Sequence, residues 1–274
     1  MNISIIGAGF GGLAAAALLS EKGHNVTVYE KNEQYGGRAR IHKDKGFQFD
    51  MGPSWYLMPN VFEEFYKNLN SKPEDHFELQ RLDPSYRIFF GKDNIIDIYA
   101  DMEKNLEVFD KLEENGGTKL KDYLKGAEEK YKTAMDGLIY QDYGSIFDFF
   151  NLNLLKQGAK LDIFRNLDDL VKKHFDSDEA RKILEYSIGF LGGSPKITPA
   201  IYQLMSYVDF IEGVWFPKGG IHKVAESIYN IAKENGTKFK FNTEITKIEV
   251  KDGRAKYLKV DGNKFPTDLV IVNG

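Results

Sequence analysis

The chain has no cysteine, only five histidines and no long apolar run among its 274 residues. The absence of cysteine excludes disulfides, thiolate metal sites and a cysteine nucleophile. The histidines (His24, His42, His76, His174 and His222) lack the spacing of metal ligands, so we expect no metal. Lysine and arginine (37) are fewer than aspartate and glutamate (41), and the net charge of −4 gives no basic footprint for nucleic acid.

Signals for membrane insertion and secretion are also lacking. No apolar run reaches the ~18 residues that a membrane-spanning helix needs. The first expected strand begins at Ile3, which leaves no space for a signal peptide. We therefore expect a cytoplasmic protein, and any membrane contact would be peripheral, on the inner face of the membrane.

The first forty residues contain a strand, a helix and a second strand in succession. Residues 3–6 and Asn25–Tyr29 favour strands, and residues 13–21 favour a helix. Between the first strand and the helix lies Gly7-Ala8-Gly9-Phe10-Gly11-Gly12, which matches the motif G-x-G-x-x-G. Such glycines allow a tight turn and a close approach to a diphosphate, which the N-terminus of the helix attracts.

The residues after this unit indicate which dinucleotide is bound. Glu30 closes the second strand 18 positions after Gly12, where an acid accepts hydrogen bonds from a ribose diol and disfavours the 2′-phosphate of NADP. Gly36-Gly37-Arg38 follows. An NAD dehydrogenase has no need of this second glycine pair, whereas the longer FAD continues past the first turn. We therefore predict FAD as the cofactor.

The motifs resemble those of the flavoprotein group that includes amine oxidases, protoporphyrinogen oxidase and carotenoid desaturases. Residues 49–56 and 213–220 look most like segments of bacterial-type phytoene desaturases and dehydrosqualene desaturases. The resemblance implies that the stretch 52–54 passes close to the isoalloxazine ring and that the backbone at position 245 holds the adenine edge. The candidate cofactor-binding residues are Gly7, Gly9, Gly11, Gly12, Glu30, Lys31, Gly37, Arg38, Gly52, Pro53, Ser54 and Ile245.

The predicted fold is α/β: a Rossmann-like FAD-binding domain with a helical insertion and the beginning of an antiparallel substrate-domain sheet. Residues 1–70 and 212–274 form the two parts of the FAD-binding domain. Residues 71–100 start the substrate sheet with a hairpin at 86–99, and residues 101–211 form the insertion. In the family the apolar strand at 268–272 lies about mid-protein, so we expect a fragment or a split-gene half with a separate C-terminal half.

The resemblance implies an oxidoreductase that desaturates a long polyisoprenoid by hydride transfer to FAD. Aromatic residues make up 14% of the chain, which suits such an apolar substrate. The aromatic run within 140–155 fits helix core, the favoured interpretation, or else a tunnel mouth or a membrane-interface surface where a lipid could enter. No catalytic residue can be named: Asp142 and Asp148 are candidates, but solvated surface acids explain them better. The alternatives are an amine oxidase or protoporphyrinogen-oxidase-like enzyme, or an inactive half.

Overall fold

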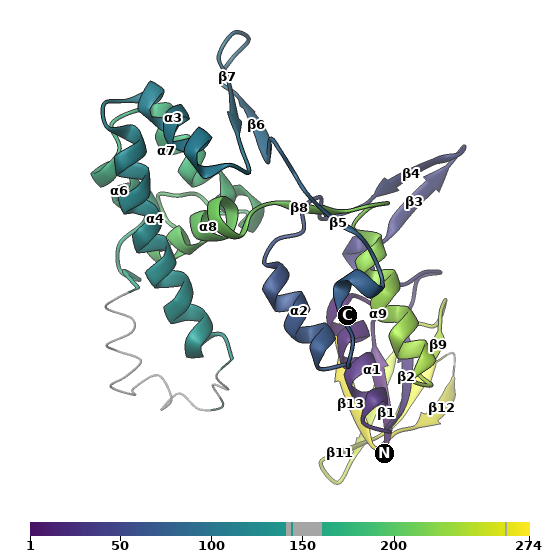
Figure 1. Ribbon diagram of the computed structural model, residues 1–274. Coiled ribbons are helices and arrows are strands. Elements are labelled where there is room, and N and C mark those ends of the chain that lie inside the picture. Colours follow the sequence, from purple (N-terminus) through teal and green to yellow (C-terminus); the bar gives the residue numbers. More distant parts are fainter. Residues whose placement is uncertain (141–143, 145–160, 261) are drawn as a thin grey trace. The chain divides into compact units, whose positions relative to one another are not determined.

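A computed structural model describes residues 1–140, 144, 161–260 and 262–274. The chain forms two compact units, drawn as ribbons in Figure 1. Unit 1 comprises Met1–Gln80 and Trp215–Gly274, and unit 2 comprises Arg81–Val214. The division of the sequence into two parts of an FAD-binding domain (1–70 and 212–274), the start of a substrate sheet (71–100) and an insertion (101–211) stays a prediction.

A four-stranded parallel sheet forms the centre of unit 1, with the strand order β13-β1-β2-β9 (Figure 1). Helix α1 connects β1 to β2, and α9 packs against α1. Ile5 in the middle of β1 is fully buried and pairs with Val28 and Ile271 on the two neighbouring strands. The elements are β1 (Asn2–Ile6), α1 (Phe10–Glu21), β2 (Asn25–Tyr29), α9 (His222–Glu234), β9 (Lys238–Lys240) and β13 (Leu269–Val272). The predicted α/β fold with a Rossmann-like domain is confirmed.

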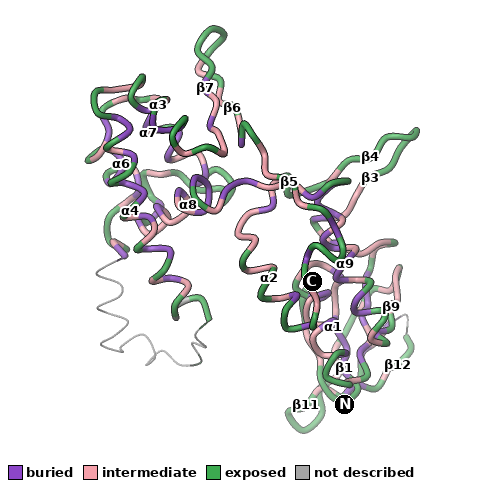
Figure 2. The backbone as a smooth tube through the Cα atoms, in the orientation of Figure 1, coloured by how far each residue is buried: buried purple, intermediate pink, exposed green. Residues whose placement is uncertain are grey.

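Smaller elements surround this sheet. Figure 2 shows that the hairpin of β3 (Ile41–Asp44) and β4 (Phe47–Asp50), which the sequence did not predict, is exposed over most of its length. An antiparallel meander contacts the sheet, since Phe265 on its last strand lies 6.0 Å from Tyr29 of β2 between ring centroids. The remaining elements are η1 (Gly37–Ala39), α2 (Pro59–Lys67), η2 (Pro73–Asp75), β5 (Leu79–Arg81), β8 (Trp215–Pro217) and the meander strands β10 (Lys247–Lys251), β11 (Arg254–Val260) and β12 (Asn263–Pro266).

Strand β13 differs from its prediction in one respect. Its unbroken apolar run predicted a parallel strand in the core, and it does pair in parallel with β1. However, it lies at an edge of the sheet, and Leu269 and Val272 are 41% and 62% exposed. The core position was wrong because, among the described residues, no strand pairs with the outer side of β13.

The described part of unit 2 is mainly helical, and β6 and β7 form the hairpin predicted for residues 86–99. Its core packs Phe109, Tyr123, Leu167 and Ile183 from four different helices. The elements are β6 (Tyr86–Phe89), β7 (Ile95–Ile98), α3 (Met102–Leu112), α4 (Gly116–Thr133), the π-helical η3 (Ala134–Leu138), α6 (Leu167–His174), α7 (Asp178–Glu185), η5 (Tyr186–Leu191), η6 (Ala200–Gln203), α8 (Leu204–Tyr207) and η7 (Val208–Glu212).

Caps decide where the helices of unit 2 begin. The run Ser177-Asp178-Glu179 predicts a helix start with a serine cap, and Ser177 does cap α7, because its hydroxyl accepts a hydrogen bond from the N–H of Ala180. The sequence pattern predicts a helix over 162–175, but α6 begins at Leu167. Asn166 is its N-cap, and the side chain of Asn166 accepts a hydrogen bond from the N–H of Asp169 at 2.7 Å.

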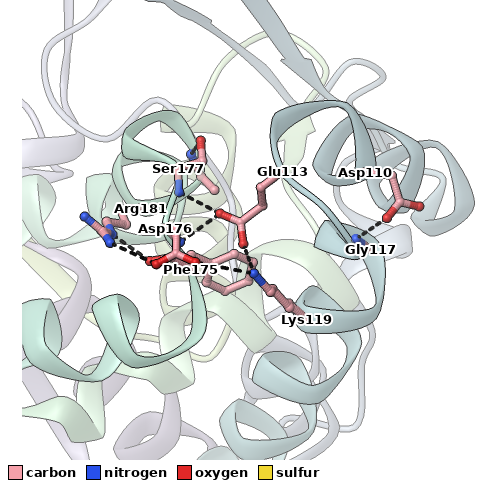
Figure 3. A network of polar contacts seen from close by, with 9 residues as sticks. Asp110, Glu113, Gly117, Lys119, Phe175, Asp176, Ser177 and Arg181 are labelled. Carbon is pink, nitrogen blue, oxygen red and sulfur yellow. Dashed lines mark hydrogen bonds and ion pairs between the residues drawn. The ribbon is translucent and has the colours of Figure 1, made fainter.

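The carboxylate of Glu113, at the end of α3, holds the start of α7 (Figure 3). One oxygen, Oε2, accepts hydrogen bonds from the backbone N–H groups of Asp176 (2.9 Å) and Ser177 (2.6 Å). The other, Oε1, accepts a hydrogen bond from Lys119 Nζ on α4. A single side chain thus joins the consecutive helices α3 and α4 to the start of α7, which lies 63–64 positions further along the chain.

Candidate dinucleotide-binding site

A cavity of about 830 Å³ lies in unit 1 at the carboxyl ends of β1, β2 and β13, a size within the ~300–1,000 Å³ usual for ligand pockets. The carboxyl edge of a parallel sheet is where open α/β folds bind their ligands. The cavity is lined by Ile6, Gly7, Gly9, Phe10, Gly11, Tyr29, Glu30, Lys31, Asn32, Gly36, Gly37, Arg38, Ala39, Arg40, Pro53, Thr243, Glu244, Ile245, Asn273 and Gly274.

The glycine turn between β1 and α1 is tightly packed at Gly7 and Gly12 and open at Gly9. A Cβ on Gly7, where φ is +97°, would lie 2.5 Å from the carbonyl oxygen of Asn273, and one on Gly12 would lie 2.0 Å from the carbonyl oxygen of Gly7. Gly9, by contrast, has nothing nearer than 3.6 Å at its Cβ position. The N-cap of α1 is Gly9, and no side chain caps it. The first N–H groups of α1 therefore begin beside open space, as a diphosphate requires.

The second glycine pair packs directly against this turn. The N–H of Gly36 donates a hydrogen bond to the carbonyl oxygen of Ala8 at 2.8 Å, and a Cβ on Gly37 would lie 3.0 Å from the Cα of Gly9. Both glycines have positive φ, of +103° and +57°. The pair thus holds Arg38 at the cavity wall, next to the N-terminus of α1.

Glu30 lies at the end of β2 and is only 5% exposed. Its Oε2 accepts a hydrogen bond from the N–H of Ala8 at 2.8 Å, and its Oε1 accepts two from Asn32. The acid predicted to bind the ribose therefore also fixes the glycine turn to the end of β2. Three cationic residues, Lys31, Arg38 and Arg40, line the same cavity.

The structure brings most of the predicted cofactor-binding residues together. Those that line the cavity are Gly7, Gly9, Gly11, Glu30, Lys31, Gly37, Arg38, Pro53 and Ile245. Gly12, Gly52 and Ser54 do not line it. Gly12 and Gly52 are in tight backbone contacts instead, since a Cβ at either would lie 2.0 Å from a carbonyl oxygen, that of Gly7 or of Arg38. That the cavity residues bind a cofactor stays a prediction.

Sequence reasoning missed several residues of the wall. Asn273 follows β13, and its N–H donates a hydrogen bond to the carbonyl oxygen of Ile6 at 2.8 Å. Its side-chain oxygen would lie 2.6 Å from a Cβ on Gly11. The signal was present, because residues that follow two neighbouring parallel strands meet at one sheet edge. Tyr29, whose pKa is raised by burial, and Asn32 were also missed.

Other predictions concern parts of the chain away from this cavity. Among the described residues, no group of side chains could hold a metal ion, and no helix is long and apolar enough to cross a membrane. Asp142, Asp148 and nearly all of the aromatic run at 140–155 lie outside the described residues. The catalytic candidates and the membrane-contact surface therefore stay predictions.

The parallel sheet, the glycine turn and the acid at the end of β2 define a fold of the Rossmann class, which in other proteins binds dinucleotides. Residues 10–274 match the sequence profile of the family described as flavin containing amine oxidoreductase. The chain belongs to this family.

Two curated relatives match 99% of the chain. A carotenoid 3,4-desaturase of Haloarcula japonica is 38% identical over 273 residues, which are 55% of its length. A 4,4′-diapophytoene desaturase (4,4′-diaponeurosporene-forming) of Staphylococcus aureus is 33% identical over 273 residues, which are 54% of its length. The chain thus spans about half the length of the curated relatives it matches.

Solved structures show the same fold at lower sequence identity. An oxidoreductase from Methanosarcina mazei aligns with all of this chain and 58% of its own, with a TM-score of 0.61 and 22% identity. Wild-type putrescine oxidase bound to putrescine aligns with 99% of this chain and 58% of its own, with a TM-score of 0.63 and 17% identity. These likenesses support the fold alone.

Proposed function

We propose that the chain is the FAD-binding part of an oxidoreductase that desaturates a long, apolar polyisoprenoid. The observation that carries the cofactor assignment is the cavity itself. It combines an open glycine turn at the N-terminus of α1 with an acid at the end of β2 and a second glycine pair that holds Arg38 at the wall. The polyisoprenoid is supported by the curated relatives, two desaturases with 33–38% identity.

The residues of the cavity fit an FAD molecule in three parts. Gly9 and the first N–H groups of α1 would receive the diphosphate, with Arg38 beside it. Glu30 would accept a hydrogen bond from the adenosine ribose, and the backbone near Ile245, which lines the same cavity, would hold the adenine. When bound, FAD supplies an acceptor for the hydride that leaves an allylic carbon.

We further propose that turnover requires a further segment of protein, in the same chain or as a separate one. Two facts support this: the chain spans about half of each curated relative, and β13 leaves Leu269 and Val272 exposed at the sheet edge. Hydride transfer needs flavin and substrate carbon held about 3–3.5 Å apart in a dry cavity.

The cofactor assignment is tested by titrating the purified chain with FAD and following flavin fluorescence. Glu30→Ala is expected to weaken binding by about 1–3 kcal/mol, because a charge-assisted contact with the ribose is lost. Glu33→Ala is the matched control, since Glu33 is a nearby exposed acid that does not line the cavity. Equal FAD affinity in the wild type and in Glu30→Ala would contradict the proposed contact between Glu30 and the ribose of FAD.

The activity is tested by giving phytoene, dehydrosqualene and an amine to the chain, alone and together with the C-terminal portion of a desaturase. We expect FAD-dependent conversion of a polyisoprenoid only when both portions are present. Oxidation of the amine instead would contradict the proposed substrate class. Conversion of phytoene by the 274-residue chain alone would contradict the need for a further segment.

A further inference from the structure

Asn32 binds the carboxylate of Glu30 at two points. Its backbone N–H donates a hydrogen bond to Glu30 Oε1 at 2.9 Å, and its side-chain Nδ2 donates to the same oxygen at 2.7 Å. The other oxygen, Oε2, accepts from the N–H of Ala8 at 2.8 Å. Both Glu30 and Asn32 line the cavity.

The number of acceptor positions limits what Glu30 can still bind. A carboxylate offers about four lone-pair positions, two on each oxygen. Asn32 occupies both positions on Oε1, and Ala8 occupies one on Oε2. One position on Oε2 is left for a ligand.

The backbone around this pair is itself held in place. The N–H of Glu30 donates to the carbonyl oxygen of Lys240 at 2.9 Å, and the N–H of Thr243 donates to the carbonyl oxygen of Glu30 at 2.8 Å. The N–H of Asn242 donates to the carbonyl oxygen of Asn32 at 3.0 Å. The ends of β2 and β9 are thus bound to each other, so the backbone that carries Glu30 and Asn32 is held in place before any ligand arrives.

We infer that Asn32 is a positioning residue that orients Glu30 and leaves it a single acceptor for one hydroxyl of the nucleotide ribose. This inference rests on the proposed function, since it assumes an adenine dinucleotide in the cavity. A purely structural Asn32 would stabilise the loop at the end of β2 without affecting how the site distinguishes ribose hydroxyls. The two roles therefore differ in their effect on the relative affinities for nucleotides that lack one ribose hydroxyl.

The experiment measures the affinity of the purified chain for ADP, 2′-deoxy-ADP and 3′-deoxy-ADP by calorimetry. The wild type is expected to bind one of the two deoxy compounds roughly tenfold more weakly than ADP, and the other about as well as ADP, because only one hydroxyl meets Oε2. Asn32→Ala is expected to weaken ADP binding by roughly tenfold and to reduce this discrimination. Gln34→Ala is the matched control: its side-chain amide donates to the carbonyl oxygen of Ile41 and does not line the cavity.

Two further variants separate positioning from folding. Asn32→Asp keeps the shape of the side chain but places an acceptor 2.7 Å from Glu30 Oε1, so it should weaken ADP binding more than Asn32→Ala does. In a Glu30→Ala background, Asn32→Ala should have almost no further effect, because a residue that acts through Glu30 has nothing left to orient. The thermal midpoint of each variant is recorded alongside.

The outcomes have distinct consequences. Equal losses for both deoxy compounds would contradict the single acceptor, and an Asn32→Ala effect of the same size with and without Glu30 would show that Asn32 does not act through it. A wild-type chain that binds neither FAD nor ADP would overturn the proposed function, and the inference with it. A wild type that binds both, with an Asn32→Ala variant that binds ADP equally well, would overturn the inference alone.

Discussion

Alanine at position 12 should destabilise unit 1, whereas alanine at position 11 should not. A Cβ on Gly12 would lie 2.0 Å from the carbonyl oxygen of Gly7 and 3.1 Å from its carbon. Both obstacles are backbone atoms, so no rotamer change relieves the overlap. At position 11 the nearest atom is the side-chain oxygen of Asn273, at 2.6 Å, and this side chain can rotate away.

The magnitude follows from two opposing contributions. Overpacking typically costs about 1–3 kcal/mol, and a backbone obstacle places Gly12→Ala at the upper end. Replacing glycine by alanine within a helix returns about 1 kcal/mol, and both positions lie in α1. We expect Gly12→Ala to lower the free energy of unfolding by about 2 kcal/mol and Gly11→Ala to leave it unchanged or raise it by up to about 1 kcal/mol.

The assay uses the positions of the tryptophans. Both, Trp55 and Trp215, belong to unit 1, so their fluorescence during urea unfolding reports on the unit that carries the glycine turn. Equal unfolding midpoints for Gly11→Ala and Gly12→Ala would refute the steric explanation, because the two variants gain the same helix propensity and differ only in the atoms that the new Cβ meets.

Two predictions concern unit 2 and are measured as urea unfolding by far-UV circular dichroism at several pH values. Burial works to raise the pKa of Glu113, but Lys119 and the N–H groups of Ser177 and Asp176 lower it below its ordinary 4.5. Since the folded pKa lies below the unfolded one, the stabilisation is present above pH ~4.5 and is lost as the pH falls further. Glu113→Gln should therefore lower the free energy of unfolding by about 1–3 kcal/mol at pH 7 and by less in acid. A loss that does not depend on pH would contradict a stabilising role for the ionised carboxylate of Glu113. Burial raises the pKa of Asp209 from 3.8 to about 6, although Tyr86 and Tyr186 donate hydrogen bonds that lower it. The folded pKa exceeds the unfolded one, so the contribution of Asp209 to stability falls as the pH rises from about 4 to 6. The free energy of unfolding of Asp209→Asn should therefore rise relative to that of the wild type as the pH rises from about 4 to 6. If the two free energies change in parallel with pH, the pKa of Asp209 is not raised by burial.

The parts of the fold that the sequence predicted are those determined by neighbouring residues. The βαβ unit of β1, α1 and β2 was recognisable because its periodicity changes at a glycine turn. Ser177 was recognisable as the cap of α7 because a hydroxyl stands directly before two acids. The sequence also predicts a helix that holds Leu120, Tyr123, Leu124 and Tyr131, and all four are buried in α4.

The parts that were missed depend on contacts between distant residues. Tyr66 of α2 is fully buried, and its hydroxyl is hydrogen-bonded to that of Ser227, 161 positions away, a contact that the local pattern of the helix does not predict. The position of β13 at the sheet edge depends on what pairs with it, and an apolar run does not contain that information. Asn32 and Asn273 reached the cavity wall because strands distant in sequence end at the same edge.

The contact between the two glycine motifs has a consequence for how this sequence can vary. Gly9 and Gly37 come so close that a Cβ on Gly37 would lie 3.0 Å from the Cα of Gly9. When a core side chain grows, a smaller neighbour can usually compensate for the added volume. Here the neighbour is already the smallest residue there is, so no second substitution can restore the space. A larger residue at position 37 must therefore displace the backbone of the first turn, whatever residue stands at position 9.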